Sequence, residues 1–119
     1  MTKIPSAIGP YSAYRKSGDL LITSGQLPLD PETNRLEGDT TYLQAKQSLK
    51  NIKVILETES IDFSKILKLT VYMTNLDDFV SVNKAFEEEL NAPYPARTAI
   101  QISQLPMHAL VEIEATAEL

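Results

Sequence analysis

A strand-like alternation runs through residues 95–102, Pro95-Ala96-Arg97-Thr98-Ala99-Ile100-Gln101-Ile102. The chain then turns and returns as a second alternating stretch, Ala109-Leu110-Val111-Glu112-Ile113-Glu114-Ala115. Successive side chains of a strand point to opposite faces, so Arg97, Glu112 and Glu114 each fall opposite the apolar residues of their own stretch. We interpret the two stretches as one ribbon that carries a guanidinium and two carboxylates away from its main apolar face.

Two interpretations of these charges stay open at this point. Charged side chains on a half-solvated sheet commonly form surface ion pairs of little energetic consequence. A guanidinium near carboxylates is also typical of a binding site, in which Arg97 would clamp the carboxylate of a ligand and a glutamate would handle a water or a proton.

The composition favours one acidic globular domain over residues 1–119. Eleven basic and sixteen acidic residues give a net charge of −5, which disfavours a nucleic-acid partner because phosphate backbones are normally bound by basic patches. The absence of cysteine excludes disulfides, thiolate metal ligands and thiol nucleophiles. The N-terminus lacks the apolar run of a signal peptide, and no apolar stretch is long enough to cross a membrane. We therefore expect a soluble cytoplasmic protein that binds neither nucleic acid nor membrane.

The remaining elements follow from local signals along the chain. Ser17-Gly18-Asp19 is typical of a hairpin turn, and the spacing of apolar residues predicts two helices. In chain order, we predict strands at Ser12–Lys16 and Leu20–Ser24, then a loop from Gln26 to Gly38 that has room for a short extended piece. A helix from about Thr41 to Glu59 follows, capped by Asp39 or Thr40, then a strand at Ile66–Met73 and a helix from Asn75 or Asp77 through Leu90.

Polar side chains lie beside the apolar stripes of both predicted helices. Gln44, Gln47 and Asn51 recur at helical spacing, which suits either a solvated face or a contact with another helix or subunit. The apolar face of the second helix consists of Phe79, Val82, Phe86 and Leu90. Asn83 falls on this face, where an amide without a hydrogen bond would cost about 1–3 kcal/mol. Asn83 is therefore either a structural residue bonded to backbone or a residue that faces a site.

The order strand, strand, helix, strand, helix, strand, strand predicts an α+β fold. Two long helices can cover one face of a mixed or antiparallel sheet. The other face combines threonine and tyrosine with apolar residues, so it is either solvated or buried in an oligomer. We favour an oligomer with sites near its seams.

Short motifs are dispersed over nearly the whole chain. They are Ala7-Ile8-Gly9-Pro10-Tyr11-Ser12, Ser24-Gly25-Gln26 with Pro28, the helical set Gln44, Gln47 and Asn51, Asp78-Phe79 with Val82-Asn83, Pro95-Ala96-Arg97-Thr98, Leu105-Pro106, and Val111-Glu112-Ile113-Glu114-Ala115. Together they resemble the RidA (YjgF) family of imine and enamine deaminases. The resemblance implies a chorismate-mutase-like fold and a homotrimer with one site in each inter-subunit cleft.

The resemblance also implies roles for single residues. Arg97 matches the arginine that binds the substrate carboxylate, and Glu112 matches the glutamate that acts on the water. The other matching pocket positions are Tyr11, Ser24, the backbone at Gly25, and Asn83. Ala99 stands where many relatives have cysteine, so a substrate contact there would come from the backbone.

The implied reaction is the hydrolysis of 2-imino acids, such as 2-iminopropionate and 2-iminobutyrate, and of enamine acids such as 2-aminoacrylate, to 2-keto acids and ammonia. The Arg97 fork matches a carboxylate, and Glu112 can take a proton from water and return one to nitrogen. No metal and no other cofactor is needed. His108 is the only histidine, and we interpret it as a turn residue before the last strand.

Three other functions are weighed against this one. A trimeric module that senses or buffers small 2-keto acids without turnover would keep Arg97 and could lose Glu112. A ribonuclease is disfavoured by the acidic charge balance and the single histidine. A chorismate mutase rests on fold analogy alone.

Overall fold

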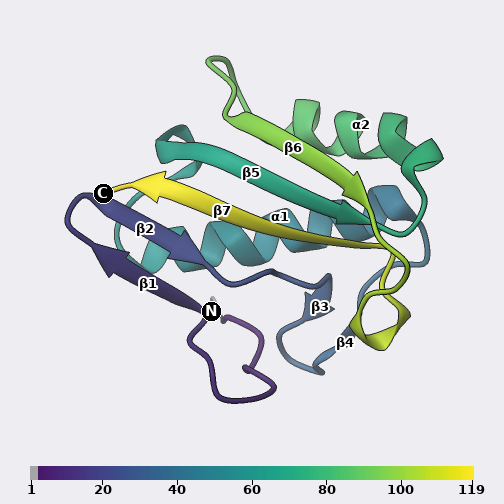
Figure 1. The fold of residues 1–119 in the computed structure, drawn as a ribbon. Helices are drawn as coiled ribbons and strands as arrows, with labels where there is room; N and C mark the ends of the chain where they lie inside the picture. Colours follow the sequence, from purple (N-terminus) through teal and green to yellow (C-terminus); the bar gives the residue numbers. More distant parts are fainter. Residues whose placement is uncertain (1–2) are drawn as a thin grey trace.

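The computed structural model describes residues 3–119, which form a sheet layer and a helix layer (Figure 1). The five-stranded sheet has the order β1-β2-β7-β5-β6, and both helices lie on one of its faces. Its strands are β1 (Tyr14–Ser17), β2 (Leu20–Thr23), β5 (Ile66–Met73), β6 (Ala96–Gln101) and β7 (Val111–Glu118), and the helices are α1 (Thr41–Thr58) and α2 (Phe79–Glu89). The α+β prediction with two helices on one face of a mixed sheet is confirmed.

Most predicted element boundaries agree with the structure to within about two residues. The Thr40 hydroxyl caps α1 by accepting from the Leu43 N–H, and Asn75 caps a short turn that leads into α2. The predicted loop after β2 contains two short extended pieces, which pair with each other as a small separate ribbon. It pairs β3 (Leu29–Asp30) with β4 (Arg35–Leu36). Three 3-10 turns complete the description: η1 (Phe63–Lys65), η2 (Leu76–Asp78) and η3 (Pro106–His108).

The prediction that the two alternating stretches pair as one ribbon is wrong, because β5 lies between β6 and β7. The α2 crossover carries the chain back so that β6 runs parallel to β5, while β7 runs antiparallel to β5 on its other side. Proximity in the sequence predicts that the two stretches pair, whereas the crossover through α2 places β6 on the opposite side of β5 from β7.

The prediction that Arg97 shares a face with Glu112 and Glu114 is also wrong. Paired residues on adjacent strands point to the same face. Arg97 pairs with Leu69, which is 1% exposed in the core under the helices, whereas Glu112 pairs with Tyr72, three residues further along β5. Arg97 therefore lies on the helix-covered face, and both glutamates lie on the open face. Alternation orders side chains within one strand, but it does not specify which side of each strand meets the helices.

The core lies between the sheet and the two helices. Its fully buried side chains come from α1, α2, β2, β5 and β7, and they include Leu21, Leu49, Ile52, Leu56, Leu69, Val71, Met73, Val82, Val111 and Ile113. The predicted core stripes of both helices are confirmed by this packing. Neither helix among residues 3–119 combines the length and the apolar character needed to span a bilayer.

The polar stripe of α1 is neither a solvated face nor a helix contact. Asn51 is 1% exposed, and its amide donates to the carbonyls of Leu27 (3.1 Å) and Leu29 (3.0 Å). Gln47 donates to the same Leu29 carbonyl (3.2 Å), and Gln44 donates to the Gly38 carbonyl and accepts from the Leu110 N–H. These side chains satisfy the backbone of the segment between β2 and α1, so this irregular segment is fixed against the helix.

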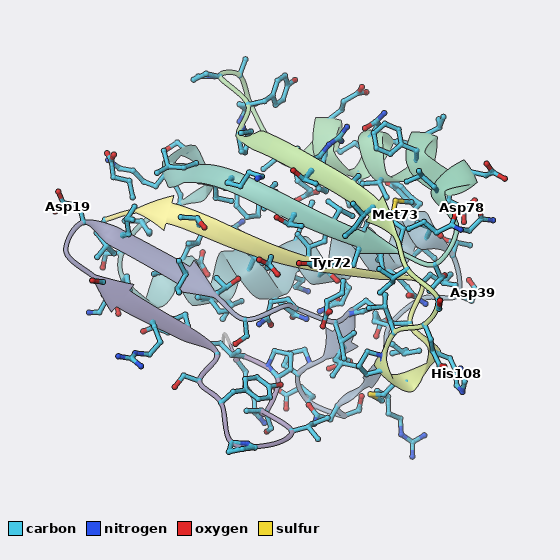
Figure 2. All side chains as sticks on the ribbon, viewed as in Figure 1. Asp19, Asp39, Tyr72, Met73, Asp78 and His108 are labelled. Atoms are coloured by element: carbon cyan, nitrogen blue, oxygen red, sulfur yellow. The ribbon has the colours of Figure 1, made fainter. Side chains whose placement is uncertain are left out.

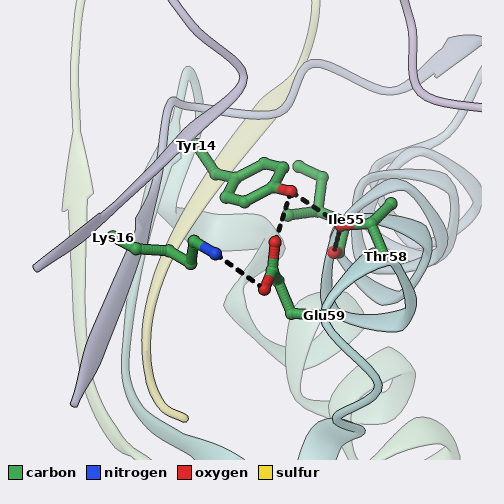
Figure 3. Close-up of polar contacts among 5 residues, drawn as sticks. All are labelled: Tyr14, Lys16, Ile55, Thr58 and Glu59. Atoms are coloured by element: carbon green, nitrogen blue, oxygen red, sulfur yellow. Dashed lines mark hydrogen bonds and ion pairs between the residues drawn. The ribbon is translucent and has the colours of Figure 1, made fainter. Parts of the chain in front are cut away.

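A polar cluster fastens the first hairpin to the end of α1 (Figure 3). The Tyr14 hydroxyl donates to Glu59 Oε2 (2.8 Å), Lys16 Nζ donates to Glu59 Oε1 (3.0 Å), and Thr58 Oγ1 lies 3.0 Å from the Tyr14 hydroxyl. The hydrogen bond from Tyr14 and then that from Lys16 lower the pKa of the Glu59 carboxyl. The cluster gives Tyr14 a structural role.

The open face of the sheet carries apolar and polar groups side by side. Leu20, Ile22 and Ile100 lie on this face and are 44%, 52% and 41% exposed. The Tyr72 side chain projects from the same face near the middle of the sheet (Figure 2). The hydroxyl of Tyr72 donates to Glu114 Oε1 at 2.9 Å.

Candidate functional site

Four of the predicted site residues line one cavity on the open side of the sheet. The cavity has a volume of about 460 Å³, and Tyr11, Ser24, Gly25 and Glu112 lie in its wall. Apolar side chains of the neighbouring loops, including Leu27 and Leu29 and Pro106, complete the lining. We refer to this group as the Glu112 half-site.

A single pair of backbone hydrogen bonds brings Gly25 against Glu112. The Gln26 N–H donates to the Ile113 carbonyl (2.7 Å), and the Ile113 N–H donates back to Gln26 (3.2 Å), so the exit of β2 runs alongside β7. A Cβ atom at position 25 would lie only 2.7 Å from Glu112 Cδ. Any side chain larger than hydrogen at this position would displace the Glu112 carboxylate, which explains why glycine stands here.

The loop before β1 positions the other two residues of the Glu112 half-site. Ser24 Oγ donates to the Ser12 carbonyl (2.6 Å), and the Ser24 N–H donates to the Ala13 carbonyl (2.8 Å). Tyr11 follows a turn in which Gly9 has a φ of 124°, and its hydroxyl accepts a long hydrogen bond from the Ile8 N–H (3.3 Å). The Tyr11 ring is 51% exposed, so it lies at the mouth of the cavity.

Glu112 is partly buried and carries a perturbed carboxyl. Burial is the main cause that raises the pKa of Glu112 above its ordinary value, and the negative charge of Glu114 adds to it. The hydrogen bond to Glu114 is in turn the main cause that raises the pKa of Tyr72. A carboxylate whose protonated form is favoured by its surroundings is suited to accept and return a proton.

Arg97 and Asn83 meet on the other face of the sheet. Arg97 Nη1 donates to Asn83 Oδ1 at 2.6 Å, and the guanidinium carbon lies 4.6 Å from the centre of the Phe79 ring and 5.6 Å from that of Phe86. A cavity of about 320 Å³ beside them is lined by the polar side chains of Arg97, Asn83 and Glu87, by Tyr94, and by apolar residues that include Leu69, Phe86 and Leu90. We refer to this group as the Arg97 half-site.

The guanidinium in the Arg97 half-site is available to an anion. Among residues 3–119, Arg97 forms no ion pair with a carboxylate. Partial burial lowers the pKa of Arg97 from its ordinary high value, and the group stays protonated. A partly desolvated guanidinium without a carboxylate partner is suited to bind a carboxylate through its fork.

The predicted site residues therefore divide into two half-sites that one chain does not bring together. Ala99 lies on the Arg97 face, is partly buried against the core, and lines neither cavity. The Asn83 amide is bonded to a side chain rather than to backbone, so the site-facing alternative is favoured. His108 lies in the η3 turn before β7, as predicted. The part of the chain that the structure describes holds no group of three histidine, cysteine, aspartate or glutamate side chains that could bind a metal ion.

Sequence reasoning missed the two aromatic residues that contact Arg97. Phe79 and Phe86 were interpreted only as members of the apolar face of α2. Their spacing of seven residues with Asn83 between them places all three on one face of the helix, and this pattern could have indicated a surface built around one cation.

Comparison with known proteins gives matches over nearly the whole chain. The family described as Endoribonuclease L-PSP matches residues 1–119. The 2-iminobutanoate/2-iminopropanoate deaminase of Salmonella typhimurium is 43% identical over 116 residues, which cover 95% of this chain and 90% of the relative. The match to this deaminase is therefore not confined to one motif.

Solved structures agree with the fold as closely. RidA from the Antarctic bacterium Psychrobacter has a TM-score of 0.94 at 40% identity, covering 98% of this chain and 94% of that one. Escherichia coli TdcF, whose crystal structure contains bound serine, has a TM-score of 0.90 at 36% identity, with coverage of 98% and 94%. The chorismate-mutase-like fold is thereby confirmed. The full-length family match and the identity to these relatives lead to one conclusion: the chain belongs to the RidA family, also called the YjgF, L-PSP or RutC family.

Proposed function

We propose that the protein hydrolyses 2-imino acids and their enamine tautomers, such as 2-iminopropionate, 2-aminoacrylate and 2-iminobutyrate, to 2-keto acids and ammonia. The observation that carries the proposal is the Arg97 guanidinium, which is held by Asn83 and has no carboxylate partner within residues 3–119. The similarity to named 2-iminobutanoate/2-iminopropanoate deaminases supports the choice of substrate. The serine bound to TdcF also supports it, since serine carries a carboxylate next to a nitrogen-bearing carbon.

The chemistry needs one anchor and one proton carrier. Arg97 binds the substrate carboxylate with two parallel hydrogen bonds. Glu112 takes a proton from a water molecule as the water oxygen adds to the imine carbon, which gives a carbinolamine. That proton passes to the nitrogen and completes the carbinolamine. Glu112 then moves the hydroxyl proton of the carbinolamine to the same nitrogen, the C–N bond breaks, and ammonia leaves as the C=O bond of the keto acid forms. One water is consumed and Glu112 ends as it began, so no redox partner is required.

We further propose that the site is completed between copies of the chain in a homotrimer. Arg97 and Glu112 lie on opposite faces of one sheet, so a second copy is needed to bring an Arg97 half-site to a Glu112 half-site. The open face, with its exposed Leu20, Ile22 and Ile100, offers apolar surface for such an assembly.

The assembly has a direct test in solution. Sedimentation equilibrium at micromolar concentration should give a mass of about three times 13.2 kDa. A strict monomer would contradict the proposal, because both half-sites would then remain incomplete.

Imine trapping tests the activity. An amino-acid oxidase or a threonine dehydratase generates 2-iminopropionate or 2-iminobutyrate in place, and semicarbazide traps what remains. Free imines hydrolyse in water unaided, so the measurement compares trapping rates with and without the protein. We expect wild type to suppress trapping at catalytic concentrations.

A non-catalytic module that binds small 2-keto acids is the alternative. The observation in its favour is that the Arg97 half-site has its anchor, its amide and its apolar cavity on one face, without Glu112. Binding of 2-ketobutyrate without any suppression of imine trapping would favour this module. Cleavage of RNA would favour the endoribonuclease in the family's description, which the net charge of −5 disfavours.

A further inference from the structure

The Arg97 side chain lies against one face of α2 that is built from two rings and an amide. Phe79, Asn83 and Phe86 occupy positions i, i+4 and i+7 of the helix, so they point in one direction. The guanidinium carbon is within about 6 Å of both ring centres, which is the range of a cation–π contact. The Asn83 oxygen accepts from Nη1 at 2.6 Å.

We propose that Phe79, together with Asn83 and Phe86, is a positioning residue that holds the Arg97 guanidinium in one orientation for carboxylate binding. The binding part of this inference rests on the proposed function. We assign Asn83 the role of positioning Arg97 rather than of contacting the ligand, because its amide oxygen already accepts a hydrogen bond from the guanidinium.

The physical reason is the flexibility of arginine. A mobile arginine side chain loses rotational freedom about several bonds when it binds a ligand, and this loss of conformational entropy weakens binding. An arginine that is already fixed against two rings and an amide has lost this rotational freedom during folding. The Asn83 contact occupies one of the five N–H groups of the guanidinium, which leaves donors for a bidentate carboxylate.

The residues that contact Arg97 differ in how much their substitution would destabilise the fold. Phe86 is 7% exposed and belongs to the core, so its removal would also destabilise the fold. Phe79 is only partly buried at the first turn of α2. Phe63 offers a matched control, because it is also a partly buried phenylalanine packed against the core but lies in η1, whereas the rings in cation–π contact with Arg97 are those of Phe79 and Phe86.

The first measurement needs no ligand. Side-chain ¹⁵Nε relaxation by NMR reports the mobility of each arginine, and Arg15 and Arg35 are exposed internal references. We expect Arg97 to be rigid in wild type and mobile in Phe79→Leu, with rigidity restored in Phe79→Tyr and unchanged in Phe63→Leu. Asn83→Ala provides a second variant, which should mobilise Arg97 while both aromatic rings remain in place.

The second measurement is the Kd for 2-ketobutyrate by calorimetry. Phe79→Leu should weaken binding by roughly 2- to 30-fold, the span of one cation–π contact, while kcat changes less than KM. Phe79→Tyr should recover most of the affinity, and Phe63→Leu should leave it unaltered.

The outcomes separate this inference from the proposed function. Equal rigidity of Arg97 in wild type and Phe79→Leu overturns the positioning role whatever the ligand does. Weaker binding without greater mobility overturns it as well, because Phe79 would then contact the ligand itself. Greater mobility in a protein whose wild type binds no keto acid supports the positioning role and contradicts the proposed function instead.

Discussion

Arg97→Ala is expected to abolish the binding of 2-ketobutyrate and of benzoate-like carboxylates while the assembly stays intact. The guanidinium has no carboxylate partner among residues 3–119, so its removal leaves no buried charge unpaired in the free protein. Losing a desolvated charge-assisted pair with the ligand costs roughly 2–5 kcal/mol, which is a loss of affinity of about 30-fold or more. Calorimetry measures the binding, and sedimentation measures the assembly.

Two further variants define what the Arg97 result means. Arg97→Lys should restore binding only in part, because an ammonium lacks the planar fork that matches a carboxylate. Arg35→Ala, at an exposed arginine of β4, should bind like wild type. An Arg97→Ala protein that still binds and deaminates normally would overturn the whole assignment of the Arg97 half-site.

Glu112→Gln is expected to retain keto-acid binding and to lose turnover. In the proposed site the carboxylate of the ligand is bound by Arg97, so we expect binding without Glu112. An amide cannot accept a proton from water at neutral pH, and a positioned general base contributes about 10²- to 10⁴-fold. The imine-trapping assay should therefore give the spontaneous rate for this variant.

Glu114→Gln is the internal control for Glu112. Glu114 shares the open face with Glu112 but lies about 7 Å further along the strand, where it accepts the Tyr72 hydroxyl. Turnover of this variant should stay within a few-fold of wild type. If wild type and Glu112→Gln accelerate imine loss equally, Glu112 is not the proton carrier.

The pH dependence of turnover provides a second test of Glu112 and Glu114. A general base works in its ionised form, so turnover should be present above the pKa of Glu112 and fall as the pH drops through it. Burial and then Glu114 raise this pKa above the ordinary 4.5, so the acid limb should lie above that value. Glu114→Gln removes the repulsion between the two carboxylates and should move the limb to lower pH. A limb that stays in place would show that the charge of Glu114 does not act on the catalytic base.

The fold was largely predictable because its elements carry strong local signals. The strand at Ile66–Met73 alternates over its whole length, and the core stripe of α1 repeats over four turns. The pairing of β6 with β5 was not predictable from alternation alone. Strand neighbours are set by crossover length and by which faces the helices cover, and these are properties of the assembled sheet.

The sequence motifs named most of the residues that line the two cavities, but they did not predict how these residues are arranged. The resemblance named seven positions. The structure places Tyr11, Ser24, Gly25 and Glu112 along one cavity and Arg97 and Asn83 along another, whereas Ala99 lines neither. The contact between Gly25 and Glu112 depends on a single bridge between Gln26 and Ile113. One isolated bridge between distant segments leaves no periodic trace in a sequence.

The separation of Arg97 and Glu112 by the sheet has a genetic consequence if neighbouring copies complete each site. A gene copy that lacks Arg97 still supplies an intact Glu112 half-site, and one that lacks Glu112 still supplies an intact Arg97 half-site. When both inactive alleles are expressed together, mixed trimers would form. One cleft of each mixed trimer would combine an intact Arg97 half-site from one gene product with an intact Glu112 half-site from the other. Two alleles that are each null alone would then complement one another, whereas a single allele carrying both changes could complement neither.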